Sequence, residues 1–131
     1  MAVAERRADK LILLYPALCI PDDAKLGKML FIRFNPKDID NTLKCKIFRF
    51  SPEYPKSAIN IDVYGIIEKI SAPILIIHGN NDKIVNISYA EKAVKTAKSG
   101  KLSVLAGAGH GFNKRQIKTA NKTMDVFLKN R

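Results

Sequence analysis

Residues 71–85 read SAPILIIHGNNDKIV, and this stretch decides the fold. Pro73–His78 is a continuous apolar run that Gly79 brings to an end. A strand of a parallel sheet is covered on both faces, so its sequence is a hydrophobic run and not an alternation. Glycine allows the chain to leave such a strand sharply. The sequence therefore predicts a buried parallel strand over 73–78, with Asp82 presented just beyond the edge of the sheet.

Working outward, two further runs have the same character. Leu11–Tyr15 is apolar and ends at Pro16, and Lys101–Leu105 leads into a glycine-rich loop. Apolar residues at helical spacing predict helices over 87–98 and 114–129. The order of strand, long excursion, strand, helix, strand and helix predicts an α/β fold with a parallel sheet.

Two details of these helices are predicted as well. Ser99–Gly100 has the composition of a C-terminal cap for the first helix. The second helix carries an apolar stripe that is expected to face the sheet and consists of Ile117, Ala120, Met124, Phe127 and Leu128.

The excursion over residues 19–61 differs from the rest of the chain. It contains four of the six prolines and half of the aromatic residues. We expect a short helix over Asp22–Ile32 and a strand over Cys45–Phe50. A bare loop of this length is uncommon between core strands, so we interpret 19–61 as a cap or lid inserted into a single domain of residues 1–131. The alternative is an insertion that covers no ligand.

Asp82 and His110 are the candidate catalytic residues. Each follows a predicted strand, and the two lie 28 positions apart, which accommodates one helix and one strand. Functional groups of parallel sheets gather at the carboxyl ends of the strands. Asp82 would accept a hydrogen from His110 Nδ1, fix its tautomer and stabilise the imidazolium. Taken singly, Asp82 could be a turn residue and His110 a loop histidine, and His78 is interpreted as a structural residue at a strand end.

Bulk composition narrows the function classes. The 131 residues carry a formal charge of +11, but the lysines are spread along the chain, so nucleic-acid binding is disfavoured. No apolar run in the sequence is long enough to span a bilayer, and the N-terminal residues do not have the pattern of a signal peptide. Cys19 and Cys45 lack a CxxC pattern and are expected to be reduced, which favours a cytoplasmic protein; the alternative is a single disulfide between them. Two histidines in dissimilar loops do not make a zinc site, and neither a metal nor a cofactor is expected.

The stretch Ser71–Phe112 resembles the last two core strands of α/β-hydrolases, with an HGxxDxxV loop and a GxGHxF loop. Leu11–Pro21 is similar to the strand that follows the nucleophile strand in that fold. The proline-rich excursion resembles the inserted cap of bacterial cinnamoyl- and feruloyl-esterase-type carboxylesterases. The resemblance implies that Asp82 is the triad acid and His110 the base, that the cap shapes an acyl pocket, and that Phe112, the aromatic residue after the histidine, has a packing role.

One departure from the family pattern concerns the nucleophile. In this fold a serine on a G-x-S-x-G turn precedes the acid and the histidine, and this chain contains no such turn. Cys19 follows a strand and is the chemically attractive substitute, but Leu18 and Ile20 do not suit a strained elbow. We therefore expect the chain to be the C-terminal portion of an α/β-hydrolase domain that begins downstream of its serine.

These observations predict a serine hydrolase acting on a small-molecule ester, inactive as this chain alone. Its first strand would expose an edge that associates with a second copy or with a companion segment supplying the N-terminal strands. The alternatives are a non-catalytic pseudo-hydrolase or binding fragment, and a peptidase of the same fold.

Overall fold

The computed structural model describes residues 8–43 and 51–130. The chain divides into two compact units. Unit 1 combines Met1–Leu18 with Tyr64–Arg131, and unit 2 is Cys19–Val63. Unit 2 spans nearly the residues that the sequence analysis interpreted as a cap, and its role as a cap stays a prediction.

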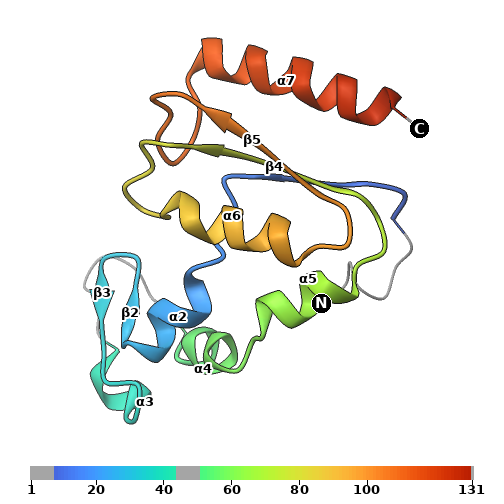
Figure 1. Cartoon of the computed structure of the whole chain (residues 1–131). Coiled ribbons are helices and arrows are strands. Elements are labelled where there is room, and N and C mark those ends of the chain that lie inside the picture. Colours follow the sequence, from blue (N-terminus) through green and yellow to red (C-terminus); the bar gives the residue numbers. More distant parts are fainter. Residues whose placement is uncertain (1–7, 44–50, 131) are drawn as a thin grey trace. The chain divides into compact units, whose positions relative to one another are not determined.

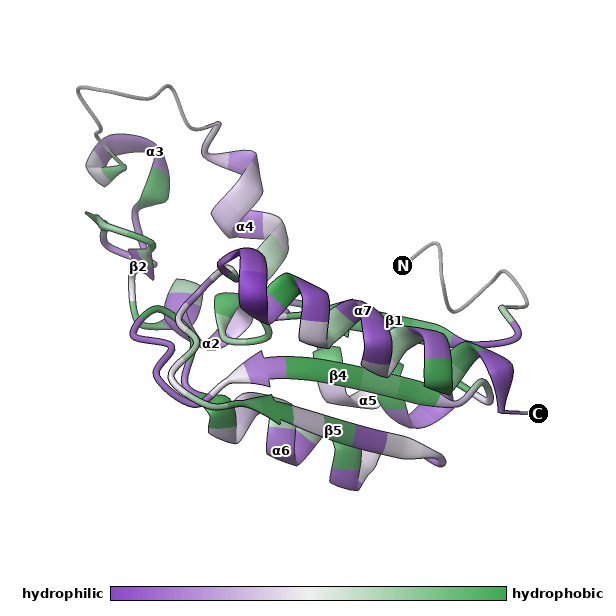
Figure 2. Ribbon diagram, turned by 90° about the horizontal axis from the view of Figure 1, so that it is seen from above, coloured by the Kyte–Doolittle hydropathy of each residue, from purple (hydrophilic) through white to green (hydrophobic). Residues whose placement is uncertain are grey.

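Unit 1 is built on a parallel sheet of three strands in the order β1-β4-β5. The strands are β1 (Leu11–Leu14), β4 (Ile74–Gly79) and β5 (Gly100–Leu105). The central strand β4 is buried along its whole length and stands out as hydrophobic in Figure 2. Three helices belong to this part of the chain: α5 (Val63–Lys69), α6 (Ile87–Thr96) and α7 (Lys114–Lys129). Helix α7 lies on one face of the sheet, and α5 and α6 lie on the other (Figure 1). The predicted α/β fold is confirmed.

The core beneath α7 is formed by the sheet and one side of the helix. Its buried members, with the partly buried residues packed against them, are Leu75, Ile77, Leu105, Ala108, Ala120, Ile12, Phe112, Met124 and Phe127. Ile117 and Leu128 were expected in this stripe, but they are 46% and 55% exposed. Leu128 is turned by about 100° around the helix from Phe127, and Ile117 lies in the first turn. Both side chains therefore lie largely outside this core.

Helix α6 ends differently from the prediction. Its C-terminal cap is Ala97, and Gly100 is the first residue of β5. A Cβ atom at Gly100 would lie 2.4 Å from the Val94 carbonyl oxygen, so β5 can start against α6 only with glycine there. The composition Ser99–Gly100 therefore reflects close packing of helix and strand, not a cap.

The start of β1 is fastened to the end of α7 by Lys10. Its Nζ donates hydrogen bonds to the carbonyl oxygens of Phe127 (2.6 Å) and Leu128 (2.9 Å), and to that of Asn130. The last carbonyls of a helix have no partner within it, and a cation is favoured there by the helix dipole. Lys10 thus closes the helix end and anchors it to the sheet.

Unit 2 begins with α2 (Ile20–Lys25), which is shorter than the helix predicted over Asp22–Ile32. The chain turns at Gly27 (φ 71°) into a hairpin of β2 (Lys28–Met29) and β3 (Ile32–Arg33). A Cβ atom at Gly27 would lie 2.1 Å from the Phe34 oxygen, and Phe34 N–H donates to the Gly27 carbonyl. The helix prediction over 26–32 is wrong because this tertiary closure overrides helical propensity.

The remaining helices of unit 2 are α3 (Ile39–Thr42) and α4 (Glu53–Ile59). Its buried core consists of Ala24, Met29, Phe34, Ile39 and Ala58. The strand expected over Cys45–Phe50 lies outside the described residues.

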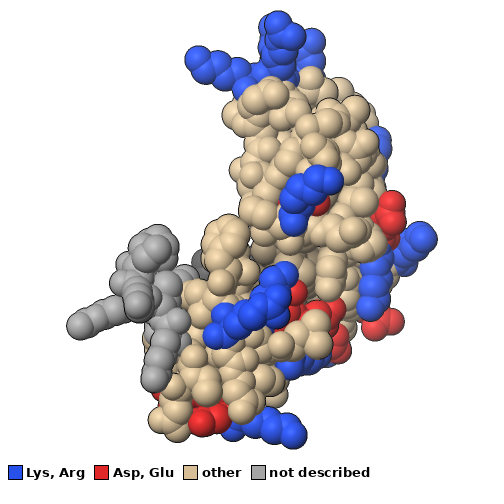
Figure 3. All heavy atoms as spheres, turned by 90° about the vertical axis from the view of Figure 1, so that its left-hand side faces the viewer, with Lys and Arg blue, Asp and Glu red and all other residues tan. Residues whose placement is uncertain are grey.

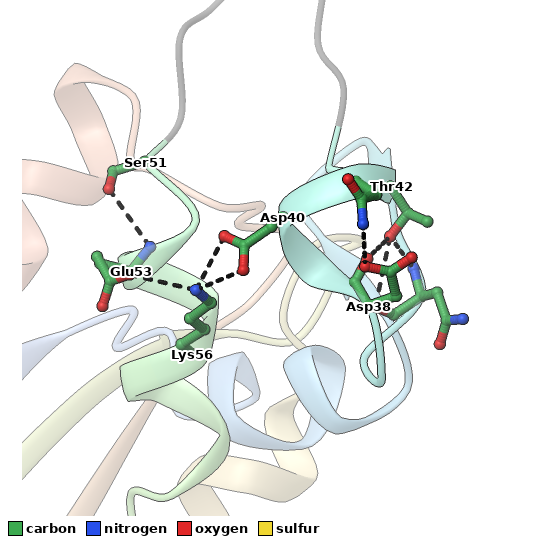
Figure 4. Close-up of polar contacts among 8 residues, drawn as sticks. Asp38, Asp40, Thr42, Ser51, Glu53 and Lys56 are labelled. Atoms are coloured by element: carbon green, nitrogen blue, oxygen red, sulfur yellow. Dashed lines mark hydrogen bonds and ion pairs between the residues drawn. The ribbon is translucent and has the colours of Figure 1, made fainter.

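Lys56 joins two helices of unit 2 (Figure 4). Its Nζ lies 2.8 Å from Asp40 Oδ2 on α3 and 3.3 Å from Glu53 Oε1 on its own helix. The hydrogen bond to Asp40 raises the pKa of Lys56. All three groups are accessible to water, so this cluster orients α3 and α4 more than it stabilises them.

The positive charge of the chain is dispersed on the face drawn in Figure 3. Lysine and arginine side chains lie there in separate groups, with uncharged surface between them.

Among the described helices, none has the length and apolarity required to cross a bilayer.

Candidate active site

Two loops at the carboxyl ends of β4 and β5 lie against each other. A Cβ atom at Gly79 would be 2.1 Å from the Ala108 oxygen, so only glycine permits this approach. Asn81 N–H donates to the Ala108 carbonyl (3.0 Å), and the Asn80 side chain accepts from Gly107 N–H (2.7 Å). Asn80 carries no sequence signal that points to this role. Its amide in effect fixes the spacing between the two loops.

Asp82 and His110 are brought together by these loops. Oδ2 of Asp82 lies 2.9 Å from Nδ1 of His110. Oδ1 of Asp82 accepts from the N–H groups of Ile84 and Val85, both at 2.9 Å. The carboxylate therefore does two things at once: one oxygen closes the turn after β4, and the other faces the histidine. The turn role weighed as an alternative for Asp82 coexists with the contact to His110.

The surroundings of Asp82 favour its charged form. Its side chain is 0% exposed. Burial by itself raises the pKa of Asp82, but the hydrogen bonds from Val85 N–H, His110 and Ile84 N–H outweigh burial and lower the pKa below its ordinary value. A carboxylate ionised at neutral pH can accept the Nδ1 hydrogen of His110 and stabilise an imidazolium.

His110 is presented on a tight turn. The flanking residues Gly109 and Gly111 pair with each other as an isolated antiparallel bridge, and Gly111 has a φ of 102°, in the region that favours glycine. Asn113 then begins α7 with a capping box that includes Gln116. The histidine side chain is 28% exposed, so its ring can meet a substrate while Nδ1 is held by Asp82. The bonded Nδ1 leaves Nε2 as the nitrogen that can accept a proton.

Tyr15 is a site residue that the sequence analysis did not identify. It follows β1 directly and has a φ of 36°, which is uncommon for a non-glycine residue. Its ring packs edge-on against His110 (centroids 5.4 Å apart) and Phe112 (4.8 Å). The residue with the positive φ is thus also the one whose ring contacts both aromatic side chains, and no sequence pattern reports a positive φ at tyrosine. Phe112 has the packing role expected for it.

His78 lies close to the carboxylate of Asp82 as well. It is fully buried, with Nε2 lying 3.0 Å from the Val85 oxygen and 3.3 Å from Asp82 Oδ2. It was interpreted as a structural residue at a strand end, and it does lie at the end of β4. Its side chain, however, reaches the turn that carries Asp82.

Cys19 does not have the properties of a nucleophile. It lies in unit 2, is buried, and is a free thiol. Burial, followed by the charge and hydrogen bonding of Asp23, raises its pKa to about 11. The thiolate is the reactive form of cysteine, so a raised pKa makes Cys19 inert at neutral pH. Across the described residues, no group of three or more His, Cys, Asp or Glu side chains is arranged to hold a metal ion.

A parallel sheet with an acid after one strand and a histidine after the next is the arrangement of the α/β-hydrolase fold. The chain matches the family model Abhydrolase_4, described as TAP-like protein, over residues 31–131, and it belongs to this α/β-hydrolase family.

Solved structures extend the comparison. Est1E from Butyrivibrio proteoclasticus, solved with ferulic acid bound, matches 98% of this chain with a TM-score of 0.86 and 28% identity. A bromoperoxidase from Bacillus anthracis matches 61% of the chain with a TM-score of 0.51 and 29% identity. The predicted resemblance to feruloyl-esterase-type hydrolases is confirmed.

A curated relative is the bifunctional esterase/perhydrolase DCH of Acinetobacter calcoaceticus. It is 32% identical over 69 residues, which is 52% of this chain. The chain covers 25% of that protein and 53% of Est1E. It therefore corresponds to a part of these relatives, and the match to Est1E covers nearly all of unit 1 and unit 2 of this chain.

Proposed function

We propose that this chain supplies the acid and the base of a serine hydrolase that cleaves carboxylic esters. The observation that carries the proposal is the 2.9 Å contact between Asp82 Oδ2 and His110 Nδ1 at the ends of adjacent parallel strands. The similarity to Est1E and to an esterase/perhydrolase supports an ester as the substrate class.

The two residues have separate roles in this reaction. Nε2 of His110 takes the proton of a serine hydroxyl as its oxygen bonds to the ester carbonyl carbon. The tetrahedral intermediate then releases the alcohol, which receives that proton from His110. Water attacks the acyl-serine in turn and gives a proton to His110, which returns it to the departing serine oxygen. Asp82 keeps the hydrogen on Nδ1 and stabilises the imidazolium in both halves.

The nucleophile in this proposal lies on a segment outside the sequence of this chain. In this fold the serine strand precedes the acid and the histidine. Strand β1 is at an edge of the described sheet, and Leu14 at its end is 37% exposed. An apolar parallel strand with a free edge favours pairing with another strand. We assign this edge to the segment that carries the serine, with a second copy of the chain as the alternative occupant.

The proposal extends to the substrate pocket and to the cellular location. Unit 2 would act as a cap that shapes the acyl pocket over a small-molecule ester. The buried free thiol of Cys19 is in keeping with a reducing, cytoplasmic location.

The test is intact-mass spectrometry after treatment with a fluorophosphonate probe. Two proteins are compared: the chain alone, and a joined protein in which the part of Est1E that precedes the matched region is followed by this chain. We expect no added mass on the chain alone and one added probe on the joined protein. A probe on the chain alone that disappears in His110→Ala would place the nucleophile within this sequence. A folded joined protein that takes no probe would indicate a non-catalytic binding fragment, and turnover of an aminoacyl anilide in preference to an ester would indicate a peptidase.

A further inference from the structure

The carboxylate of Asp82 has two imidazole neighbours, and the proposed chemistry uses only one of them. Oδ2 lies 2.9 Å from His110 Nδ1 and 3.3 Å from His78 Nε2. The side chains of Asp82 and His78 are both 0% exposed. A buried polar ring beside a catalytic carboxylate requires an account of what it does there.

The position of the hydrogen on His78 follows from its surroundings. The Val85 carbonyl oxygen lies 3.0 Å from Nε2 and can only accept a hydrogen bond, so Nε2 carries the hydrogen. The same nitrogen lies 3.3 Å from Asp82 Oδ2. Nδ1 is buried and has no hydrogen-bond partner within the described residues. The structure therefore favours the tautomer of His78 with its hydrogen on Nε2.

We propose that His78 is a positioning residue for catalysis, whose Nε2–H is shared between the Val85 carbonyl and Asp82 Oδ2 and holds this oxygen toward His110. The role in catalysis rests on the proposed function, whereas the geometry of the contact does not. Two main-chain N–H groups hold Oδ1, but they leave Oδ2 to be fixed by other donors. Ring nitrogens of His78 and His110 lie 3.3 Å and 2.9 Å from Oδ2 and are candidates for these donors.

His78 also connects the strand to the turn. Its backbone belongs to β4, while its ring reaches Val85, whose own N–H donates to Asp82 Oδ1. The turn 82–85 is thus held by two sets of hydrogen bonds: Asp82 Oδ1 accepts from main-chain N–H groups of the turn, and the His78 ring bonds to the Val85 carbonyl oxygen. A purely structural role would consist of satisfying the buried Val85 carbonyl alone. The two roles differ in what happens to the bond between Asp82 and His110 when the ring is removed.

Imidazole nitrogen NMR separates the two roles, because the chain contains only two histidines. The chain is labelled with ¹⁵N-histidine and studied as it stands, together with His78→Leu and His78→Gln. In the wild-type chain we expect hydrogen on Nε2 of His78 and a downfield Nδ1 hydrogen on His110. His78→Leu should lose the downfield signal, and His78→Gln should keep it, since the glutamine amide can place an N–H near the former Nε2.

A matched control accounts for loss of stability in general. Ile76→Ala removes buried volume from the same strand without touching Asp82, and it should keep the His110 signal. An unchanged His110 signal in folded His78→Leu would overturn the proposal and leave His78 a structural role. If His78→Leu does not fold, the wild-type spectrum still decides: hydrogen on Nδ1 of His78 would contradict the inference.

The joined protein gives the catalytic readout. His78→Leu should lower kcat for an ester more than it changes KM, and His78→Gln should restore part of kcat. If the His110 signal responds to His78 as expected but the joined protein cleaves no ester, the proposed function fails and the contact between His78 and Asp82 stands. If the ester is cleaved equally well by His78→Leu, the positioning role fails and the proposed function stands.

Discussion

Oδ2 of Asp82 lies 2.9 Å from Nδ1 of His110, although the two residues are 28 positions apart in the chain. The contact exists because β4 and β5 are adjacent and parallel, so that both loops leave the same edge of the sheet. Glycine at position 79 and the Asn80 side chain then bring the loops into register. Most of the functional expectations for this chain depend on this one hydrogen bond.

The lowered pKa of Asp82 predicts a loss of stability in acid. A carboxyl group with a lower pKa in the folded chain than in the unfolded chain stabilises the fold above its ordinary pKa of about 4, and this contribution is lost as the pH falls through the folded value. Asp82→Asn should therefore have a smaller decrease in urea midpoint between neutral pH and about pH 2 than the wild-type chain. The matched control is Asp125→Asn, which removes the same charge from an exposed position of α7. If the urea midpoint of Asp82→Asn fell as steeply in acid as that of the wild-type chain, a lowered pKa of Asp82 in the folded chain would be contradicted.

Tyr15 predicts an unusual order of stabilities. Tyr15→Phe keeps both ring contacts and should change the free energy of unfolding little. Tyr15→Ala removes the contacts with His110 and Phe112 and should cost about 1–3 kcal/mol. Tyr15→Gly removes the same contacts but relieves the positive φ, which costs an alanine about 1–2 kcal/mol. Glycine should thus be the more stable of the two truncations in urea unfolding, and the reverse order would show that the backbone at residue 15 is not strained.

The pKa of Cys19 predicts a slow reaction with alkylating agents. In a Cys45→Ser variant at neutral pH, iodoacetamide should modify Cys19 at least about a hundredfold more slowly in the folded chain than in the chain unfolded by urea. Burial disfavours the thiolate form of Cys19 and also hinders access of the reagent. The rate is followed by intact mass. If Cys19 were alkylated as fast in the folded chain as in the unfolded chain, it would again be a candidate nucleophile.

The sequence predicted the parts of this structure that depend on local pattern and order. The apolar runs located β1, β4 and β5 to within a residue or two, and the acid and histidine loops were placed from the strand ends. The helix predicted over Asp22–Ile32 was wrong beyond Lys25, because the closure of Gly27 onto Phe34 is a contact that propensity does not report.

The site was predicted only in outline for the same reason. The backbone conformation of Tyr15 and the contact of His78 with Asp82 are set by tertiary geometry. Each involves a residue whose sequence context permits several roles. A histidine at a strand end has many uses, and only the positions of Val85 and Asp82 around its ring distinguish them.

The measurement that tests the central claim most directly is the rate of ester hydrolysis by the joined protein, with wild-type, His110→Ala and Asp82→Asn forms of this chain. If the pair acts as acid and base, both variants remain folded, Asp82→Asn lowers kcat by about 10⁴-fold, and His110→Ala lowers it at least as much. Asp125→Asn is the control and should keep the wild-type rate. Wild-type kcat in folded His110→Ala would contradict the account, because the serine would then be activated by a group other than the histidine that Asp82 holds.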